Sequence, residues 1–171
     1  MIRYIGIDPG ATGGVAVLDP HGRILDLRKF DDLCPVAVLL EVFSGLDGKA
    51  AVTALELVHA APGQGVVSMF SFGVSYGKIQ GFLATLGLPY FTVSPQTWQK
   101  RLPPAETAKD RIRLKAIEVW GLERFIFPRC RVPHSGCLDA AGIARYARAV
   151  HLGKEVLPKP QTKTKRRMLK L

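Results

Sequence analysis

Short apolar segments separated by turn-forming residues open the chain. They predict strands over residues 2–8, 13–18, 23–30 and 50–58, and a shorter apolar segment predicts a fifth strand over 89–93. The turn-forming sequences Asp-Pro-Gly at 8–10 and Asp-Pro-His-Gly at 19–22 separate the first three strands. We therefore expect those three strands to pair antiparallel, whereas the nearly continuous apolar strand at 50–58 is typical of a covered parallel sheet.

Apolar residues at helical spacing predict helices over 35–44, about 66–86, 95–98, 107–120 and 135–149. In the longest of these, Gly73, Gly77 and Gly81 lie four residues apart and so share a face, where a backbone or a ligand could approach closely. Three consecutive strands followed by alternating helices and strands predict an α/β domain with a mixed sheet, antiparallel at first and parallel later.

Composition narrows the class of protein. The chain has 171 residues, of which 47% are hydrophobic, which is enough for one domain with a sizeable core. No apolar run reaches the length of a membrane span, and no charged-then-apolar leader precedes the first strand, so we expect no membrane partner and no secretion. The three cysteines, Cys34, Cys130 and Cys137, are odd in number and form no CxxC pair, which favours a reducing, cytoplasmic location.

Net charge gives the first indication of function. Lys and Arg number 24 against 14 Asp and Glu, so the chain carries +10. Pro, Thr and Lys dominate its end, and we predict a domain over residues 1–152 followed by a basic, flexible tail over 153–171. A basic body with a more basic tail favours a polyanionic partner, most often nucleic acid. The alternative is a basic protein whose tail only keeps it in solution.

Three carboxylates occupy positions where chemistry is expected. Asp8 ends the first strand, and strand alternation places it on the face of Gly6, which is expected to leave room for a ligand. Glu56 lies inside an apolar strand, where an ionised side chain is costly unless it is paired, metal-bound or at the sheet end. Asp139 falls in the first turns of the last helix. Together they suit hard cations such as Mg²⁺, which bind oxygen ligands and promote phosphodiester hydrolysis.

Each carboxylate also has an ordinary structural interpretation. Asp8 is part of an Asp-Pro-Gly turn, Glu56 could face solvent on a half-exposed strand, and Asp139 near a helix start complements the helix dipole.

Four segments, in order, resemble RuvC-type Holliday junction resolvases, in particular their phage and bacterial RuvC-like branch. The first is Ile-Gly-Ile-Asp-Pro-Gly at 5–10, with Gly-Val-Ala-Val-Leu at 14–18. The second is Glu56, followed by Pro-Gly-Gln-Gly at 62–65 and Met-Phe-Ser-Phe-Gly at 69–73. The third is Val-Ser-Pro-Gln-Thr-Trp-Gln-Lys at 93–100, and the fourth is His-Ser-Gly-Cys-Leu-Asp-Ala-Ala-Gly-Ile-Ala at 134–144.

This resemblance implies an RNase H-like fold, with a mixed five-stranded sheet flanked by helices. It also implies a homodimer and a crossover junction endodeoxyribonuclease, with Mg²⁺-dependent paired nicking of four-way DNA junctions and Mn²⁺ as a substitute. Asp8, Glu56 and Asp139 match the family's catalytic, metal-binding carboxylates. The family's fourth site residue, an Asp or His shortly before the last Asp, has no acidic counterpart here. His134 and Ser135 are the candidates, and His134 could equally be a histidine hydrogen-bonded in a loop.

DNA contacts are expected from basic and stacking side chains on either side of these motifs. Phosphates would be bound by Lys100, Arg101, Lys109 and Arg113, although the last two could belong to an ordinary solvated helix surface. Gln64, between two glycines, could approach a phosphate. Phe70 is a candidate, with His59, Met69 and Phe72, for stacking on an unpaired base, and core packing or a dimer interface is the alternative for Met69 and Phe72.

Two other functions remain open. A nuclease of the same fold could act on flaps, branched replication intermediates or RNA–DNA hybrids, and a non-catalytic protein could bind junctions without cutting them. An ATP-using phosphotransferase also fits the Asp-Pro-Gly opening, but it needs a second, similar lobe that 171 residues cannot hold.

Overall fold

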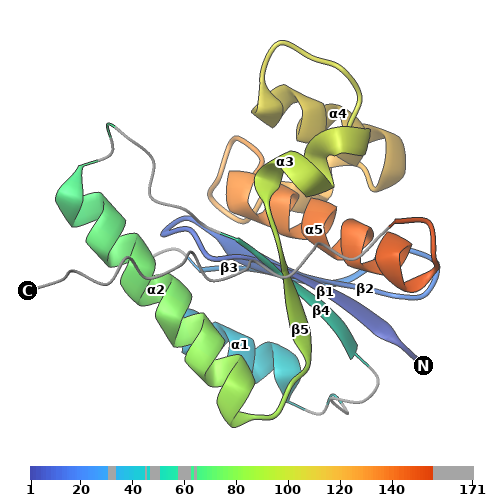
Figure 1. The fold of residues 1–171 in the computed structure, drawn as a ribbon. Helices are drawn as coiled ribbons and strands as arrows, with labels where there is room; N and C mark the ends of the chain where they lie inside the picture. Colours follow the sequence, from blue (N-terminus) through green and yellow to red (C-terminus); the bar gives the residue numbers. More distant parts are fainter. Residues whose placement is uncertain (31–33, 45, 47–50, 58–62, 64, 156–171) are drawn as a thin grey trace, which may run out of the picture.

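A mixed five-stranded sheet forms the centre of the computed structural model, which describes residues 1–30, 34–44, 46, 51–57, 63 and 65–155. The strands are β1 (Arg3–Asp8), β2 (Gly14–Leu18), β3 (Ile24–Lys29), β4 (Ala51–Glu56) and β5 (Tyr90–Val93), in the spatial order β3-β2-β1-β4-β5 (Figure 1). Pairing is antiparallel across β1, β2 and β3 and parallel across β1, β4 and β5. The predicted mixed sheet is confirmed.

Helices cover both faces of this sheet. On one face lie α1 (Pro35–Phe43) and α2 (Val66–Thr85), and α5 (Ser135–His151) crosses the other (Figure 1). A smaller layer packs beyond α5: α3 (Pro95–Trp98), the 3₁₀ helix η2 (Gln99–Arg101), α4 (Ala108–Val119) and the 3₁₀ helix η3 (Leu122–Phe125). Every predicted helix is present, and the two 3₁₀ helices, η2 and η3, are additions to the predicted elements.

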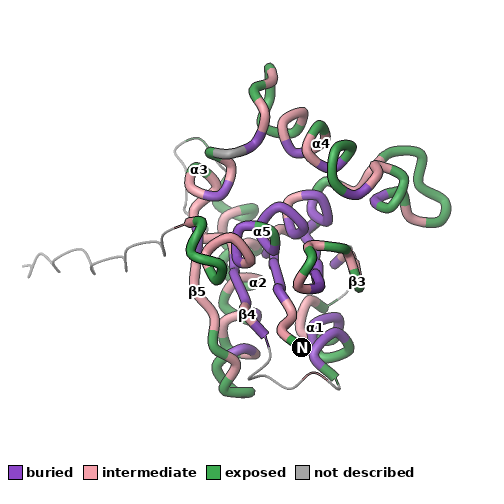
Figure 2. Tube along the Cα trace, turned by 90° about the vertical axis from the view of Figure 1, so that its right-hand side faces the viewer, coloured by how far each residue is buried: buried purple, intermediate pink, exposed green. Residues whose placement is uncertain are grey.

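Strand alternation divides the core into two. Ile5 and Ile7 of β1 are fully buried toward α1 and α2, whereas Tyr4 of the same strand packs with α5. The α5 side is the larger cluster, and α5 itself is buried along most of its length (Figure 2). Asp8 lies on the α5 side by the same alternation, so the sequence-based expectation for its face holds.

Gly6 has a packing role, and the expectation that it leaves space for a ligand is wrong. A Cβ atom added to Gly6 would lie 2.1 Å from the Ala140 oxygen and 2.3 Å from the Ala144 nitrogen, both in the backbone of α5. The missing side chain therefore lets α5 lie directly on β1. Because α5 carries Asp139, this close packing also sets the distance between Asp139 and the end of β1.

The glycine positions of α2 differ from this case. A Cβ atom added to Gly73, Gly77 or Gly81 would meet no described atom within 4 Å. The close approach that their spacing predicts is therefore not made within the described part of this chain, and the glycine face of α2 is open.

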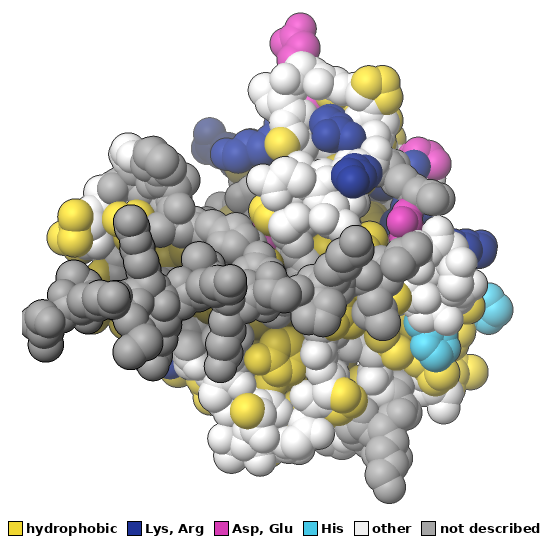
Figure 3. Space-filling model, in the orientation of Figure 1, with side chains coloured by type: hydrophobic (Ala, Val, Ile, Leu, Met, Phe, Trp, Pro, Cys, Tyr) yellow, Lys and Arg dark blue, Asp and Glu magenta, His cyan; other side chains and the backbone are white. Residues whose placement is uncertain are grey.

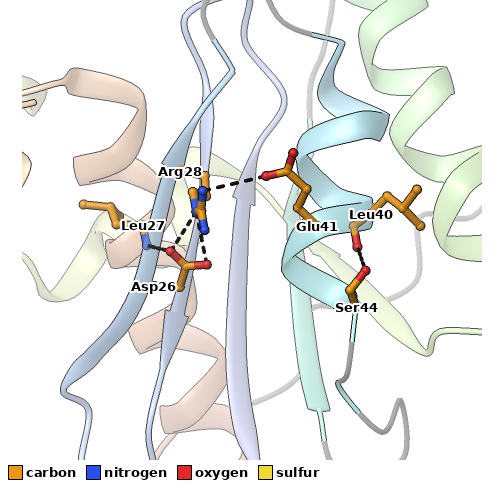
Figure 4. A network of polar contacts seen from close by, with 6 residues as sticks. All are labelled: Asp26, Leu27, Arg28, Leu40, Glu41 and Ser44. Atoms are coloured by element: carbon orange, nitrogen blue, oxygen red, sulfur yellow. Dashed lines mark hydrogen bonds and ion pairs between the residues drawn. The ribbon is translucent and has the colours of Figure 1, made fainter.

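The edge strand β3 is connected to α1 by polar contacts. Arg28 donates from Nε to Asp26 Oδ1 at 2.9 Å, and its Nη1 lies 3.7 Å from Glu41 Oε2 on α1 (Figure 4). Asp26 Oδ1 also accepts the Leu27 N–H at 2.8 Å. Arg28 and Glu41 are exposed, so their ion pair contributes little stability, at most about 1 kcal/mol.

Some sequence-based expectations concern residues outside the described ranges, and others can be compared with the structure. His59, Gln64 and residues 156–171, which make up most of the expected tail, lie outside the described residues. No disulfide bond joins any of Cys34, Cys130 and Cys137. Within the ranges given above, no helix is long and apolar enough to cross a membrane.

Candidate active site

The topology places two of the candidate carboxylates at neighbouring strand ends. Asp8 is the last residue of β1 and Glu56 the last of β4, and the parallel register pairs Ile7 with Leu55 directly before them. Asp139 lies in the second turn of α5, which packs across β1 and β4. Two strand ends and one helix therefore bring together side chains that lie 48 and 83 residues apart in the sequence.

Burial raises the pKa values of all three carboxyl groups, and repulsion from neighbouring carboxylates adds to the increase at Glu56 and Asp139. Burial raises the pKa of Asp8 to about 6, against the opposing effects of the Gly10 N–H, 3.0 Å from Oδ1, and of His134. Burial and the charge of Asp8 raise the pKa of Glu56 to about 7. Burial, Asp8 and Glu56 raise the pKa of Asp139 to about 8, and Lys109 opposes this increase. The three groups therefore form one interacting acidic cluster.

The chemistry of this donor set fits a hard divalent cation. Three carboxylates that repel one another in a partly buried site are stabilised by added positive charge, and Mg²⁺ and Mn²⁺ prefer oxygen ligands. Among the described residues, no three His, Cys, Asp or Glu side chains are already arranged to hold a metal ion together. Asp8, Glu56 and Asp139 would be the ligands, and their side chains would have to move closer on binding.

His134 caps the helix that carries Asp139. It is the N-cap residue of α5, and its Nδ1 accepts the Cys137 N–H at 3.2 Å, while its ring lies edge-on to Phe127. Because Nδ1 accepts this hydrogen bond, the ring nitrogen left to donate a proton is Nε2. His134 therefore fits the placing of water or phosphate better than metal ligation. Ser135, the other candidate, is the first residue of α5 and is exposed.

Two of the expected phosphate-binding residues line a cavity beside Asp139. Lys109 and Arg113, four residues apart on α4, border a hollow of about 370 Å³ whose wall also includes Ser135 and Asp139. Lys and Arg side chains gather over α3 and α4 (Figure 3). Lys100 is exposed in η2, and the side chain of Arg101 lies outside what the structure describes.

Arg111 has a structural role on the same helix. Its Nη2 donates to the Gln99 oxygen at 2.6 Å and to the Leu102 oxygen at 3.1 Å, and its Nε donates to the Pro103 oxygen at 3.1 Å. These bonds fix the loop between η2 and α4. Arg111 therefore has a structural role, whereas Lys109 and Arg113 of the same helix border the cavity.

A second hollow lies on the α2 side of the Asp8 turn. It has a volume of about 250 Å³ and is lined by Ala11 and by Ser68, Met69, Ser71, Phe72 and Ser75 of α2. Ser75 Oγ donates to the Pro9 oxygen at 3.1 Å and so links α2 to the turn after β1. Phe70 is not part of this lining, and it is 74% exposed.

Sequence reasoning missed Trp98 as part of the site. Its Nε1–H donates to Glu56 Oε1 at 2.8 Å. The sequence signal that could have indicated it is the position of this tryptophan in the third motif, 93–100, shortly after β5, the strand that pairs with β4.

Comparison with known proteins defines the fold class. No protein-family model and no curated protein sequence matches the chain. The mixed five-stranded sheet flanked by helices is the RNase H-like fold of RuvC structures. One such structure is Thermus thermophilus RuvC in complex with a Holliday junction substrate, with a TM-score of 0.63 and 19% identity over 90% of this chain and 98% of that one. A second structure of Thermus thermophilus RuvC gives a TM-score of 0.62 and 19% identity, over 89% and 97% of the two chains.

Proposed function

We propose that this protein is a RuvC-like endodeoxyribonuclease, of the phage and bacterial branch, that resolves four-way DNA junctions by Mg²⁺-dependent paired nicking. The observation that carries the proposal is the convergence of Asp8, Glu56 and Asp139 at the ends of β1 and β4 and on α5, within a RuvC-like fold. The positive charge of the cavity beside Asp139 supports a polyanionic substrate.

Different residues have different roles in the proposed function. Asp8, Glu56 and Asp139 would hold the cation, and Lys109 and Arg113 would hold the sugar–phosphate backbone in the cavity that Asp139 borders. When bound, Mg²⁺ or Mn²⁺ would activate a water and offset charge on the phosphate and leaving oxygen. His134 would donate from Nε2 to water or phosphate while its Nδ1 caps α5.

A homodimer suits a four-way junction because a two-fold dimer presents two such sites to a two-fold substrate. The apolar face of α2 supports this assembly: Val67 is 80% exposed, Phe70 74% and Val74 39%, and these residues follow one another at helical spacing. The open glycine positions Gly73 and Gly77 would allow a second copy to approach closely. Phe70 also remains a candidate for stacking on an unpaired base.

A substrate panel tests the proposal. We expect the protein to cut a synthetic four-way junction with Mg²⁺ and not with EDTA, and to leave linear duplex, flap and RNA–DNA hybrid intact. Asp8→Asn should abolish cutting while junction binding persists. Cutting of flaps or hybrids instead of junctions would refute the proposed substrate. Junction binding without any cutting would indicate a non-catalytic junction-binding protein.

A further inference from the structure

Trp98 makes a direct contact with the carboxylate at the end of β4. Its side chain is 4% exposed, and its Nε1–H lies 2.8 Å from Glu56 Oε1. The two residues are 42 positions apart in the sequence, so the contact depends on tertiary structure. A hydrogen bond to an ionised oxygen is about twice as strong as one between neutral groups.

The local chain path explains why the indole reaches Glu56. Val93, the last residue of β5, pairs with Glu56 in the parallel register of β4 and β5. Ser94 is the N-cap residue of α3, and Pro95 occupies the first turn, which fixes the backbone for an immediate change of direction. The Ser94 and Thr97 hydroxyl groups lie 2.9 Å apart across this turn. The chain therefore turns back beside the paired ends of β4 and β5, and this turn brings Trp98 to Glu56.

The opposite side of the indole rests on the helix that carries Asp139. A Cβ atom added to Gly142 of α5 would lie 2.6 Å from Cζ3 and 3.2 Å from Cε3 of Trp98. Ile112 of α4 fills the neighbouring space, at 2.9 Å from the same added atom. The ring is thus held between Glu56, α4 and α5, one helical turn beyond Asp139, and has little freedom to turn.

We propose that Trp98 is a positioning residue that holds Glu56 Oε1 in place, so that the Glu56 carboxylate faces the cation site beside Asp8. This inference rests on the proposed function and deepens it. Without the indole N–H, repulsion from Asp8 would favour rotation of the Glu56 carboxylate away from the cluster. Partners that orient a metal-ligating side chain typically contribute about 10- to 100-fold to metal affinity or activity.

The second tryptophan of the chain is a matched control. Trp120 is also buried, at 8% exposed, and its Nε1–H also donates at 2.8 Å, but to the main-chain oxygen of Gly22 in the turn before β3. Replacing either tryptophan with phenylalanine removes one buried donor and a similar volume. Only the Trp98 change affects a carboxylate of the cluster.

The experiment compares Trp98→Phe with Trp120→Phe in the full chain, after circular dichroism shows that both are folded. We expect the Mg²⁺ concentration for half-maximal junction cutting to rise about 10-fold or more in Trp98→Phe and to stay within about twofold in Trp120→Phe. Mn²⁺ affinity, measured by calorimetry without DNA, should weaken in the same variant. Equal Mg²⁺ and Mn²⁺ dependence in the two variants would overturn the proposal.

A spectroscopic measurement keeps the tryptophans intact. In ¹H–¹⁵N spectra the two indole N–H signals are separate reporters, and Glu56→Gln should move one of them and leave the other in place. If neither moves, the Trp98–Glu56 contact is absent and the inference fails. If one moves but the wild-type protein cuts no junction, the contact stands and the proposed function fails.

Discussion

Asp139 allows the electrostatics of the candidate site to be measured through stability. In the unfolded chain this carboxyl group ionises near pH 3.8, whereas in the fold burial and the charges of Asp8 and Glu56 raise its pKa to about 8. As pH rises through this window, the unfolded state releases a proton that the folded state retains. The contribution of Asp139 to stability is therefore lost progressively as pH rises toward 8.

Asp139→Asn removes this proton equilibrium and nearly preserves side-chain shape. Each pH unit between the two pKa values corresponds to about 1.4 kcal/mol. Between pH 5 and pH 8, the stability of the variant relative to wild type can therefore rise by at most about 4 kcal/mol. Protonation of Glu56 relieves part of the repulsion on Asp139 and lowers this figure. We therefore expect the unfolding free energy of the metal-free variant to gain about 2 to 4 kcal/mol over that of wild type across this range.

Urea denaturation in EDTA at pH 5, 6, 7 and 8 measures this gain. The difference in unfolding free energy between variant and wild type should grow with pH, and Mg²⁺ at pH 8 should stabilise wild type more than the variant because it binds the native acidic cluster. A difference that is the same at pH 5 and pH 8 would refute a raised Asp139 pKa and, with it, the view of these carboxylates as one interacting cluster.

Three further substitutions test packing, DNA contact and assembly. Gly6→Ala should destabilise the fold by about 3 kcal/mol or more in urea denaturation, because its methyl group would overlap the α5 backbone; wild-type stability would contradict this packing. Lys109→Ala and Arg113→Ala should each reduce the slope of log junction affinity against log salt concentration by about one; unchanged slopes would mean that these two side chains do not contact DNA. If the proposed homodimer forms through α2, Val67→Glu should dissociate it in analytical ultracentrifugation, whereas Leu114→Glu, at an exposed apolar position on α4, should not; equal behaviour of the two variants would exclude this face of α2 as the interface.

Much of the fold could be predicted because its signals are local. The turn after Asp8 and the apolar segments around it give the antiparallel strands, and the continuous apolar pattern of 51–56 gives a covered central strand. The face of Asp8 also follows from strand alternation alone.

Other features depend on contacts between distant segments, and no local pattern carries them. Gly6 could be read as space for a ligand because the sequence does not show that α5 fills that space. The capping of α5 by His134 and the contact of Trp98 with Glu56 likewise require the tertiary fold. The basic residues of α4 have the same charge in the sequence, and only their surroundings separate Arg111, bound to main-chain oxygens, from Lys109 beside the cavity.

The most direct test of paired junction cutting uses a supercoiled plasmid that extrudes a cruciform, which is a four-way junction within a closed circle. Two nicks made within one complex release a linear plasmid, whereas independent nicks first give a nicked circle. We predict linear product from the earliest time points, dependent on Mg²⁺ and absent with Asp8→Asn. Accumulation of nicked circles ahead of linear product, or no cutting of the cruciform, would contradict the account.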